Sequence, residues 1–252
     1  MRLDTNKMKF WQKDKNTFFC FTPEVMLITL LIEFSLAVYA FIRYRMTAFG
    51  RLVILLLILL GGFQLAEYQI CSNSNLLFWS RFGFAVITFL PVLGLHLISL
   101  VTGKSRFLKF GYILMFAYIA IFAFTPNAIT GAVCGGNYII FYTGQKLAWT
   151  YTVYFFGFLL LSIWEALENI SPVRGSEGSQ LASASNGMDA ENRKNLLIWI
   201  ILGYGSVMIP MGIVYVLSLE ARQAIPSIMC GFAIILAFIL AFKVAPKYQK
   251  LK

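Results

Sequence analysis

The chain has 252 residues, of which 59% are hydrophobic and only 13% are charged. Soluble domains carry about 25% charged residues, so this composition excludes an ordinary soluble domain. The net charge of +10 would favour nucleic acid as the partner of a soluble protein. Here the positive charges lie between long apolar segments, which is typical of a membrane protein. We therefore expect the lipid bilayer as a partner and no nucleic acid.

Seven apolar segments are each long enough to cross a bilayer, whose hydrocarbon core needs roughly 20 helical residues. The segments do not show the alternation of apolar and polar residues that is typical of strands. Each segment is also longer than a membrane β-strand, which has about 10 residues. The predicted spans are 24–43, 51–70, 78–101, 108–126, 147–168, 196–218 and 225–245. The sequence thus predicts an all-α membrane protein, a single seven-transmembrane-helix bundle over residues 1–252 with nothing of domain size outside the spans.

The first predicted span follows a tail of residues 1–23 and leads directly into Arg43. It is too long for the apolar part of a signal peptide and shows no small-residue cleavage site, so we predict a retained helix. Glu33 lies at its middle. A carboxyl at membrane depth is costly and usually faces the protein interior. No basic residue on another predicted helix clearly lies at this depth, so we expect Glu33 to line a cavity, contact a ligand or hydrogen-bond within the bundle.

The positive charges orient the predicted bundle, because Lys and Arg are retained on the cytoplasmic side. With the N-terminus outside, 13 of the 21 basic residues lie on the inner side. The tail argues against this orientation with five basic residues, but every other loop agrees with it. We therefore predict a multi-pass protein of the cell membrane with its N-terminus outside and its C-terminus in the cytoplasm.

The second and third spans carry further polar residues at membrane depth. Glu67 lies near the outer end of the second span and Arg81 opens the third, so we expect a structural ion pair between them at the outer interface. His96, the only histidine, is expected to be a hydrogen-bonded packing residue. Pro91 and Pro210 lie inside the third and sixth spans. Both are candidate hinges, because a proline removes a helical hydrogen bond.

Three of the four cysteines, Cys20, Cys71 and Cys134, fall on the predicted outer side. An oxidising compartment permits a disulfide there, and sequence alone does not fix its connectivity. Cys71 with Cys134 is the favoured pair, which would hold an outer loop (127–146) over the mouth of the bundle. The alternatives are another pairing or free thiols.

The remaining segments add little chemistry. The inner loop 171–195 is rich in Ser, Gly and Asn, so we predict a flexible linker. Ala233, Ala237 and Ala241 recur at four-residue spacing in the last span, a pattern that permits close helix packing. No nucleotide-binding, metalloprotease or nucleophile-elbow motif is found. We therefore expect no catalytic residues, no cofactor, no metal site and no enzymatic activity.

The stretch from Glu67 to Arg106 resembles the N-terminal seven-helix membrane region of bacterial histidine kinases and related signalling proteins. The matching positions are Glu67, Trp79, Arg81, Pro91, Thr102 and Gly103. The resemblance implies a sensory input module. The chain ends after KVAPKYQKLK without a kinase or coiled-coil output domain. We therefore expect any signal to pass to a separate cytoplasmic signalling protein.

Three functions remain open at this point. The first is a sensor or receptor-like module that detects an external or membrane-borne small-molecule ligand. The second is a small-solute transporter or permease that uses Glu33 and Glu67 for coupling. The third is an intramembrane lipid-modifying enzyme, which lacks a visible cluster of polar catalytic residues. The ligand-binding or coupling candidates are Glu33, Glu67, Arg81 and His96.

Overall fold

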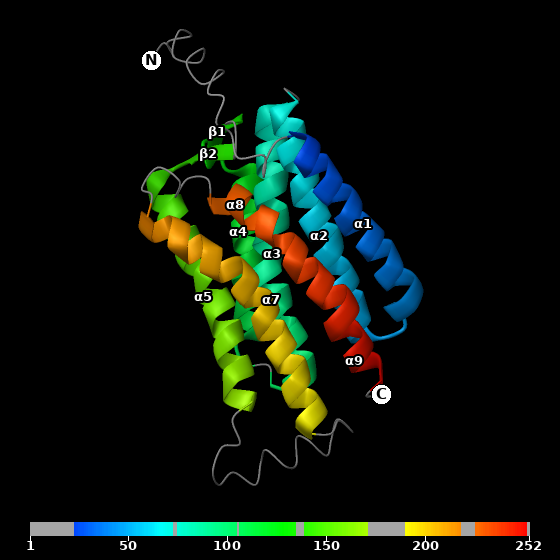
Figure 1. Ribbon diagram of the computed structural model, residues 1–252. Helices are drawn as coiled ribbons and strands as arrows, with labels where there is room; N and C mark the ends of the chain where they lie inside the picture. Colours follow the sequence, from blue (N-terminus) through cyan, green and yellow to red (C-terminus); the bar gives the residue numbers. More distant parts are fainter. Residues whose placement is uncertain are drawn as a thin grey trace, which may run out of the picture.

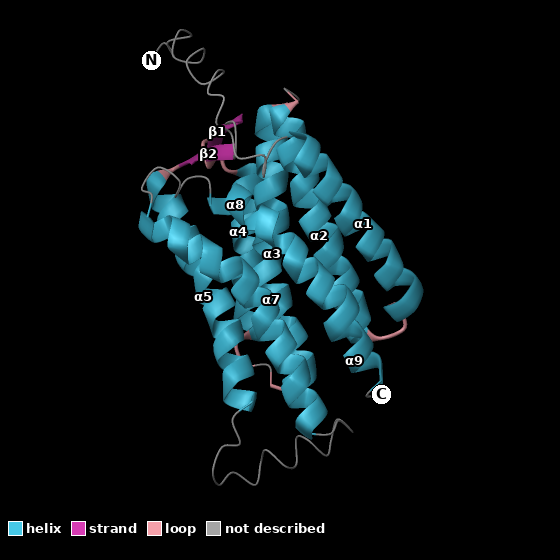
Figure 2. Ribbon diagram, in the orientation of Figure 1, coloured by secondary structure: helices cyan, strands magenta, loops and turns pink. Residues whose placement is uncertain are grey.

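Long helices lie side by side and form a bundle in the computed structural model (Figure 1, Figure 2), which describes residues 23–72, 75–104, 106–134, 139–170, 190–217 and 225–250. The tail 1–22 and most of the linker, 171–189, lie outside the described residues. The helices are α1 (Pro23–Tyr44), α2 (Ala48–Cys71), α3 (Leu76–Thr102), α4 (Leu108–Phe124), α5 (Gln145–Ile170), α7 (Ala190–Leu217), α8 (Ile225–Ile239), the π-helix η4 (Leu240–Val244) and α9 (Ala245–Lys250).

Six helices of the described chain are long and apolar enough to cross a membrane: α1, α2, α3, α5, α7 and the continuous segment Gly231–Gln249 of α8, η4 and α9. The predicted count of seven is not confirmed, because α4 has only 17 residues. At 1.5 Å per residue it is about 25 Å long, which is short of a hydrocarbon core of about 30 Å. Pro126 disfavours helical geometry at the preceding residue, and Thr125 is accordingly extended, with ψ 122°.

Capping residues move several helix boundaries from their predicted positions. Thr47 accepts a hydrogen bond from the Gly50 amide at 2.9 Å, so α2 begins three residues earlier than expected. Asn75 accepts from the Phe78 amide at 3.2 Å and starts α3. The predicted flexible linker is wrong at its end, because residues 190–195 already form the first turns of α7.

The predicted helical architecture is confirmed, but the predicted outer loop 127–146 adds a β-hairpin to it. Its strands are β1 (Ile129–Cys134) and β2 (Ile139–Thr143), which pair antiparallel. Both strands are rich in β-branched or aromatic residues. A turn leads from α4 into the hairpin: the Ala128 amide donates to the Thr125 carbonyl at 3.3 Å. Asn127 has φ 63°, a backbone geometry that Asn tolerates.

The hairpin covers the adjoining ends of α2 and α3 (Figure 1). The hairpin residues Ile129, Ile139 and Phe141 are buried. The Phe141 ring centroid lies 5.2 Å from that of Phe84 on α3 and 6.3 Å from that of Phe63 on α2. We call this end of the bundle the hairpin end, and the end where α9 finishes the opposite end.

An aromatic cluster joins α4 and α5 to α3. Tyr118 of α4 lies 5.4 Å from Tyr151 and 4.9 Å from Tyr154 of α5, measured between ring centroids. Tyr154 donates its hydroxyl to the Thr88 carbonyl of α3 at 2.8 Å, and the Thr88 hydroxyl lies 3.2 Å from the Tyr151 hydroxyl. These bonds lie one turn before Pro91, where α3 lacks a backbone donor.

A close approach at Gly94 joins α7 to α3. A Cβ atom on Gly94 would lie 1.7 Å from the Tyr204 hydroxyl oxygen and 2.8 Å from the ring carbon that bears it. Only glycine leaves room for this contact. Gly157, on an exposed face of α5, has no atom within 4 Å of the corresponding position.

We predict that Gly94→Ala lowers the free energy of unfolding by about 1–3 kcal/mol, because a methyl group overlaps the Tyr204 side chain. Thermal unfolding in mild detergent measures the change. The double variant Gly94→Ala/Tyr204→Phe should recover part of the loss, since the nearest atom is removed. The control Gly157→Ala should stabilise the fold by about 0.4–1 kcal/mol. An equal loss in both glycine variants would contradict the proposed contact.

Candidate functional site

Glu33 is the most isolated polar residue among the sequence-predicted sites. Its side chain is fully buried, with 0% exposure, at the middle of α1. Neither carboxyl oxygen has a hydrogen-bond partner among the described residues. Burial of an unpartnered polar group costs about 1–3 kcal/mol in proteins. The position therefore needs an explanation beyond packing.

Small residues of α2 lie at the level of Glu33. The neighbouring Phe34 packs on Gly61, where a Cβ atom would lie 3.2 Å from the Phe34 ring. Gly61 and Gly62 are both buried. In addition to α2, α1 contacts α8. The carboxyl is thus buried on the side of α1 that faces α2 and α8, rather than toward lipid.

A second set of buried polar residues lies nearer the hairpin end. Gln64 and Glu67 of α2 are 2% and 1% exposed, and Ser80 of α3 is fully buried. The Ser80 hydroxyl has no hydrogen-bond partner in the described part of the chain. The two helices pack closely at this level, because Gly83 of α3 lies against Ala66 of α2. The hairpin contacts both α2 and α3, next to these buried polar residues.

Among the described residues, no salt bridge joins Glu67 to Arg81 as the sequence predicted. Arg81 instead donates from Nη1 to the Ala123 carbonyl at the end of α4, at 3.2 Å. The final carbonyls of a helix lack intrahelical donors, and a guanidinium satisfies one of them here. The guanidinium of Arg81 therefore attaches α4 to α3.

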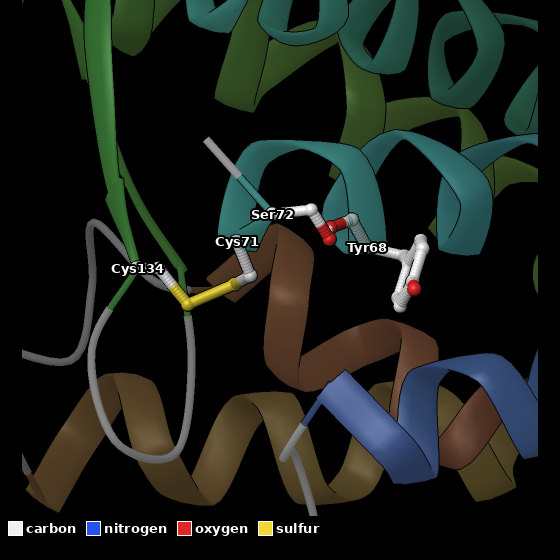
Figure 3. The surroundings of a disulfide bond; sticks show 4 residues. All are labelled: Tyr68, Cys71, Ser72 and Cys134. Atoms are coloured by element: carbon white, nitrogen blue, oxygen red, sulfur yellow. Dashed lines mark hydrogen bonds between the residues drawn. A yellow bond between two sulfur atoms is a disulfide. The ribbon is translucent and has the colours of Figure 1, made fainter. Parts of the chain in front are cut away.

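The predicted Cys71–Cys134 disulfide is present, with the two Cα atoms 5.2 Å apart (Figure 3). It joins the last residue of α2 to the last residue of β1. Beside it the Ser72 hydroxyl donates to the Tyr68 carbonyl at 2.9 Å. The disulfide holds the hairpin over the buried polar residues Gln64, Glu67 and Ser80. Cys20 lies outside the described residues.

His96 has the packing role expected from the sequence. Its Nδ1 lies 2.7 Å from the Tyr112 hydroxyl, and the two rings meet edge to face. This contact attaches α4 to the C-terminal half of α3. The described residues contain no group of three or more His, Cys, Asp or Glu side chains that could hold a metal ion.

The candidate hinges Pro91 and Pro210 lie inside α3 and α7. Both helices contribute residues to the lining of a cavity of about 40 Å³. Its walls come from α2, α3, α5, α7, α8 and the first residue of η4, and they are apolar except for the Tyr204 hydroxyl. Leu90, next to Pro91, lines it. The cavity exceeds the about 10–15 Å³ that holds one water.

The carboxylates at the opposite end of α5 lie beside positive charge. Glu168 forms an ion pair with Lys104 at 4.0 Å, and both side chains are about half exposed. Glu165 is more buried, at 6% exposure, and one of its carboxyl oxygens lacks a hydrogen-bond partner within the described residues. The pair joins the ends of α3 and α5, and exposed ion pairs of this kind contribute little stability.

Sequence reasoning missed the hairpin and the interior cavity. The alternation of buried residues in β1 and β2 is a usable signal for the hairpin, since Ile129 and Ala132 are buried in one strand, and Ile139 and Phe141 in the other. No local signal predicts the cavity, because its walls come from segments more than 150 residues apart in the chain, from Leu56 to Leu240.

Comparisons with family models, curated proteins and solved structures find no match to this chain. The resemblance to the membrane region of histidine kinases therefore stays a prediction.

We predict that Glu33→Met raises the free energy of unfolding by about 1–3 kcal/mol, because it replaces an unpartnered buried carboxyl with an apolar side chain. In a chain of this size, thermal unfolding in detergent should show a rise of about 2–4 °C per kcal/mol. Thr29→Val on the same buried face is the control. The Thr29 hydroxyl is already bonded to the carbonyls of Val25 and Met26, so its removal should bring no gain. A lower unfolding temperature for Glu33→Met would contradict the argument.

Proposed function

We propose that this integral membrane protein is a sensor or receptor-like module that binds a small apolar ligand inside the helical bundle. The observation that supports the proposal is the cavity, whose lining includes residues of both proline-containing helices. Its apolar walls suit a hydrocarbon or aromatic group. An apolar ligand that enters from the membrane would contact these apolar walls.

The size of the cavity links binding to helix movement. At about 40 Å³, it holds a small group, and a larger ligand requires α7 to move relative to α3. Tyr204 lines the cavity and also packs on Gly94 of α3, so a ligand that displaces this side chain changes the contact between the helices. A ligand shifts a conformational equilibrium only through different affinities for the two states. Pro91 and Pro210 are the proposed hinges.

The proposal includes an orientation and an output. We propose that the hairpin end and the Cys71–Cys134 bond face the outside, where a disulfide is stable. The opposite end would then face the cytoplasm, as the distribution of Lys and Arg favours. The movement of α7 would be passed to a separate cytoplasmic signalling protein. No enzymatic role is proposed.

We predict that Ala233→Phe abolishes ligand binding, because the larger side chain fills the cavity that Ala233 lines. Mass spectrometry of apolar molecules that co-purify after mild extraction should find a compound with the wild-type protein and at least about tenfold less with the variant, which corresponds to about 1.4 kcal/mol. Ala120→Phe adds the same volume on an exposed face of α4 and should retain the compound. Equal retention by Ala233→Phe would overturn the cavity as the binding site.

The alternative is a proton-coupled transporter of small solutes, and the observation that favours it is Glu33. A carboxyl buried at mid-helix without a partner is the kind of group that takes up and releases a proton in transport proteins. A sensor does not require solute flux, whereas a transporter does. The two functions therefore differ in a reconstituted system.

We expect vesicles that contain the wild-type protein to show no solute-dependent proton movement, as a sensor requires. A pH-sensitive dye inside the vesicles and a panel of small solutes outside measure the flux. Glu33→Gln tests the role of the carboxyl, and Glu168→Gln, on the half-exposed Lys104 pair, is the matched control. Proton movement that Glu33→Gln abolishes and Glu168→Gln retains would replace the sensor proposal with the transporter.

A further inference from the structure

We propose that a groove between α1 and α9 binds the headgroup of an anionic phospholipid. The groove lies at the opposite end of the bundle from the hairpin, and its volume is about 430 Å³. Small-molecule sites usually measure about 300–1,000 Å³. Tyr39, Arg43 and Tyr44 of α1 line one side, and Phe242, Pro246 and Gln249 of η4 and α9 line the other.

The groove contains one cation and several hydrogen-bonding groups. Arg43 is exposed, and its guanidinium makes no hydrogen bond or ion pair within the described part of the chain. Gln249 donates weakly to the Arg43 carbonyl, at 3.5 Å. The Tyr39 and Tyr44 hydroxyls lie 3.3 Å apart. Guanidinium and hydroxyl groups are suited to the oxygens of a phosphate.

The charge around the groove favours an anion. Residues 41–66 and 221–252, which include the α1–α2 connection and all of α8, η4 and α9, contain Arg and Lys but no Asp or Glu. Two of these cations face elsewhere: Lys243 and Lys247 lie 5.4 and 5.7 Å from the Trp199 ring of α7. Of the described residues that line the groove, Arg43 is the basic one.

The position of the groove favours a lipid as the source of that anion. Arg43 lies in the last turn of α1, at the end of a helix long enough to span the membrane. This is the depth of lipid phosphates. The groove also has an apolar side, where the Phe242 ring centroid lies 5.3 Å from that of Tyr39. Exposed Phe238 and Ile42 continue this apolar surface, which suits an acyl chain below the headgroup.

The sequence of the last helix explains why the groove exists. Pro246 has no amide hydrogen, and its ring interferes with the carbonyl four residues earlier. The helix widens to π geometry in the preceding turn: the Ala245 amide donates to the Leu240 carbonyl, five residues before it. A π-segment changes the direction of a helix and the side chains that it presents. Phe242 and Pro246 are thereby placed opposite the last two turns of α1.

Native mass spectrometry of the full chain in mild detergent tests the site by titration with phosphatidylglycerol and phosphatidylcholine. We expect phosphatidylglycerol to bind at least about tenfold more tightly than phosphatidylcholine, because only the former has a net negative headgroup. Arg43→Gln should remove this difference between the lipids. Arg51→Gln removes the same charge from the exposed start of α2, outside the groove, and should keep the difference.

Two further measurements test whether the lipid binds in the groove. Tyr39→Phe retains the fold and the charge of the groove and should weaken phosphatidylglycerol binding severalfold. Inorganic phosphate should not compete with the lipid, because it lacks the acyl chain. The proposal is overturned if Arg51→Gln weakens binding as much as Arg43→Gln, if both variants bind like the wild type, or if inorganic phosphate displaces the lipid.

Discussion

The arrangement of this bundle depends on the stretch of α3 around Pro91, where Thr88 is bonded by α5 and Gly94 is approached by α7. In a membrane, backbone groups must be satisfied by protein, and Pro91 leaves the Ile87 carbonyl without its helical donor. Tyr154 of α5 donates to the adjacent carbonyl, that of Thr88. Three residues beyond Pro91, Gly94 admits the Tyr204 hydroxyl of α7. One turn of α3 thus determines how α5 and α7 pack.

The same helix explains why the interior cavity lies where it does. α3 is the most buried of the long apolar helices, with 72% of its most apolar window inside the bundle. Helices α2, α4, α5 and α7 pack around it. Tyr204 of α7 packs on Gly94 of α3, and the same side chain lines the cavity together with apolar side chains of the neighbouring helices. A contact that holds two helices together therefore also forms the wall of the proposed ligand site.

The polar side chains of the bundle differ in whether they have hydrogen-bond partners. His96, Thr88 and Tyr154 each bond to another helix, and they strengthen the packing of α3. Glu33 does not, since both of its carboxyl oxygens lack a partner among the described residues. A buried polar residue that lowers stability is a candidate for function. This contrast distinguishes Glu33 from polar residues whose role is structural.

Composition and hydrophobic length predicted the six described helices that are long and apolar enough to cross a membrane, because the bilayer requires about 20 apolar residues for each crossing. The Cys71–Cys134 pair was also predicted, since both cysteines were assigned to one side. The hairpin, the shortened α4 and the partner of Arg81 were not, because each depends on local turns and on contacts between distant segments. The interior cavity and the groove beside Arg43 were decided by tertiary structure alone: their walls come from helices far apart in the chain, and only packing brings those side chains together.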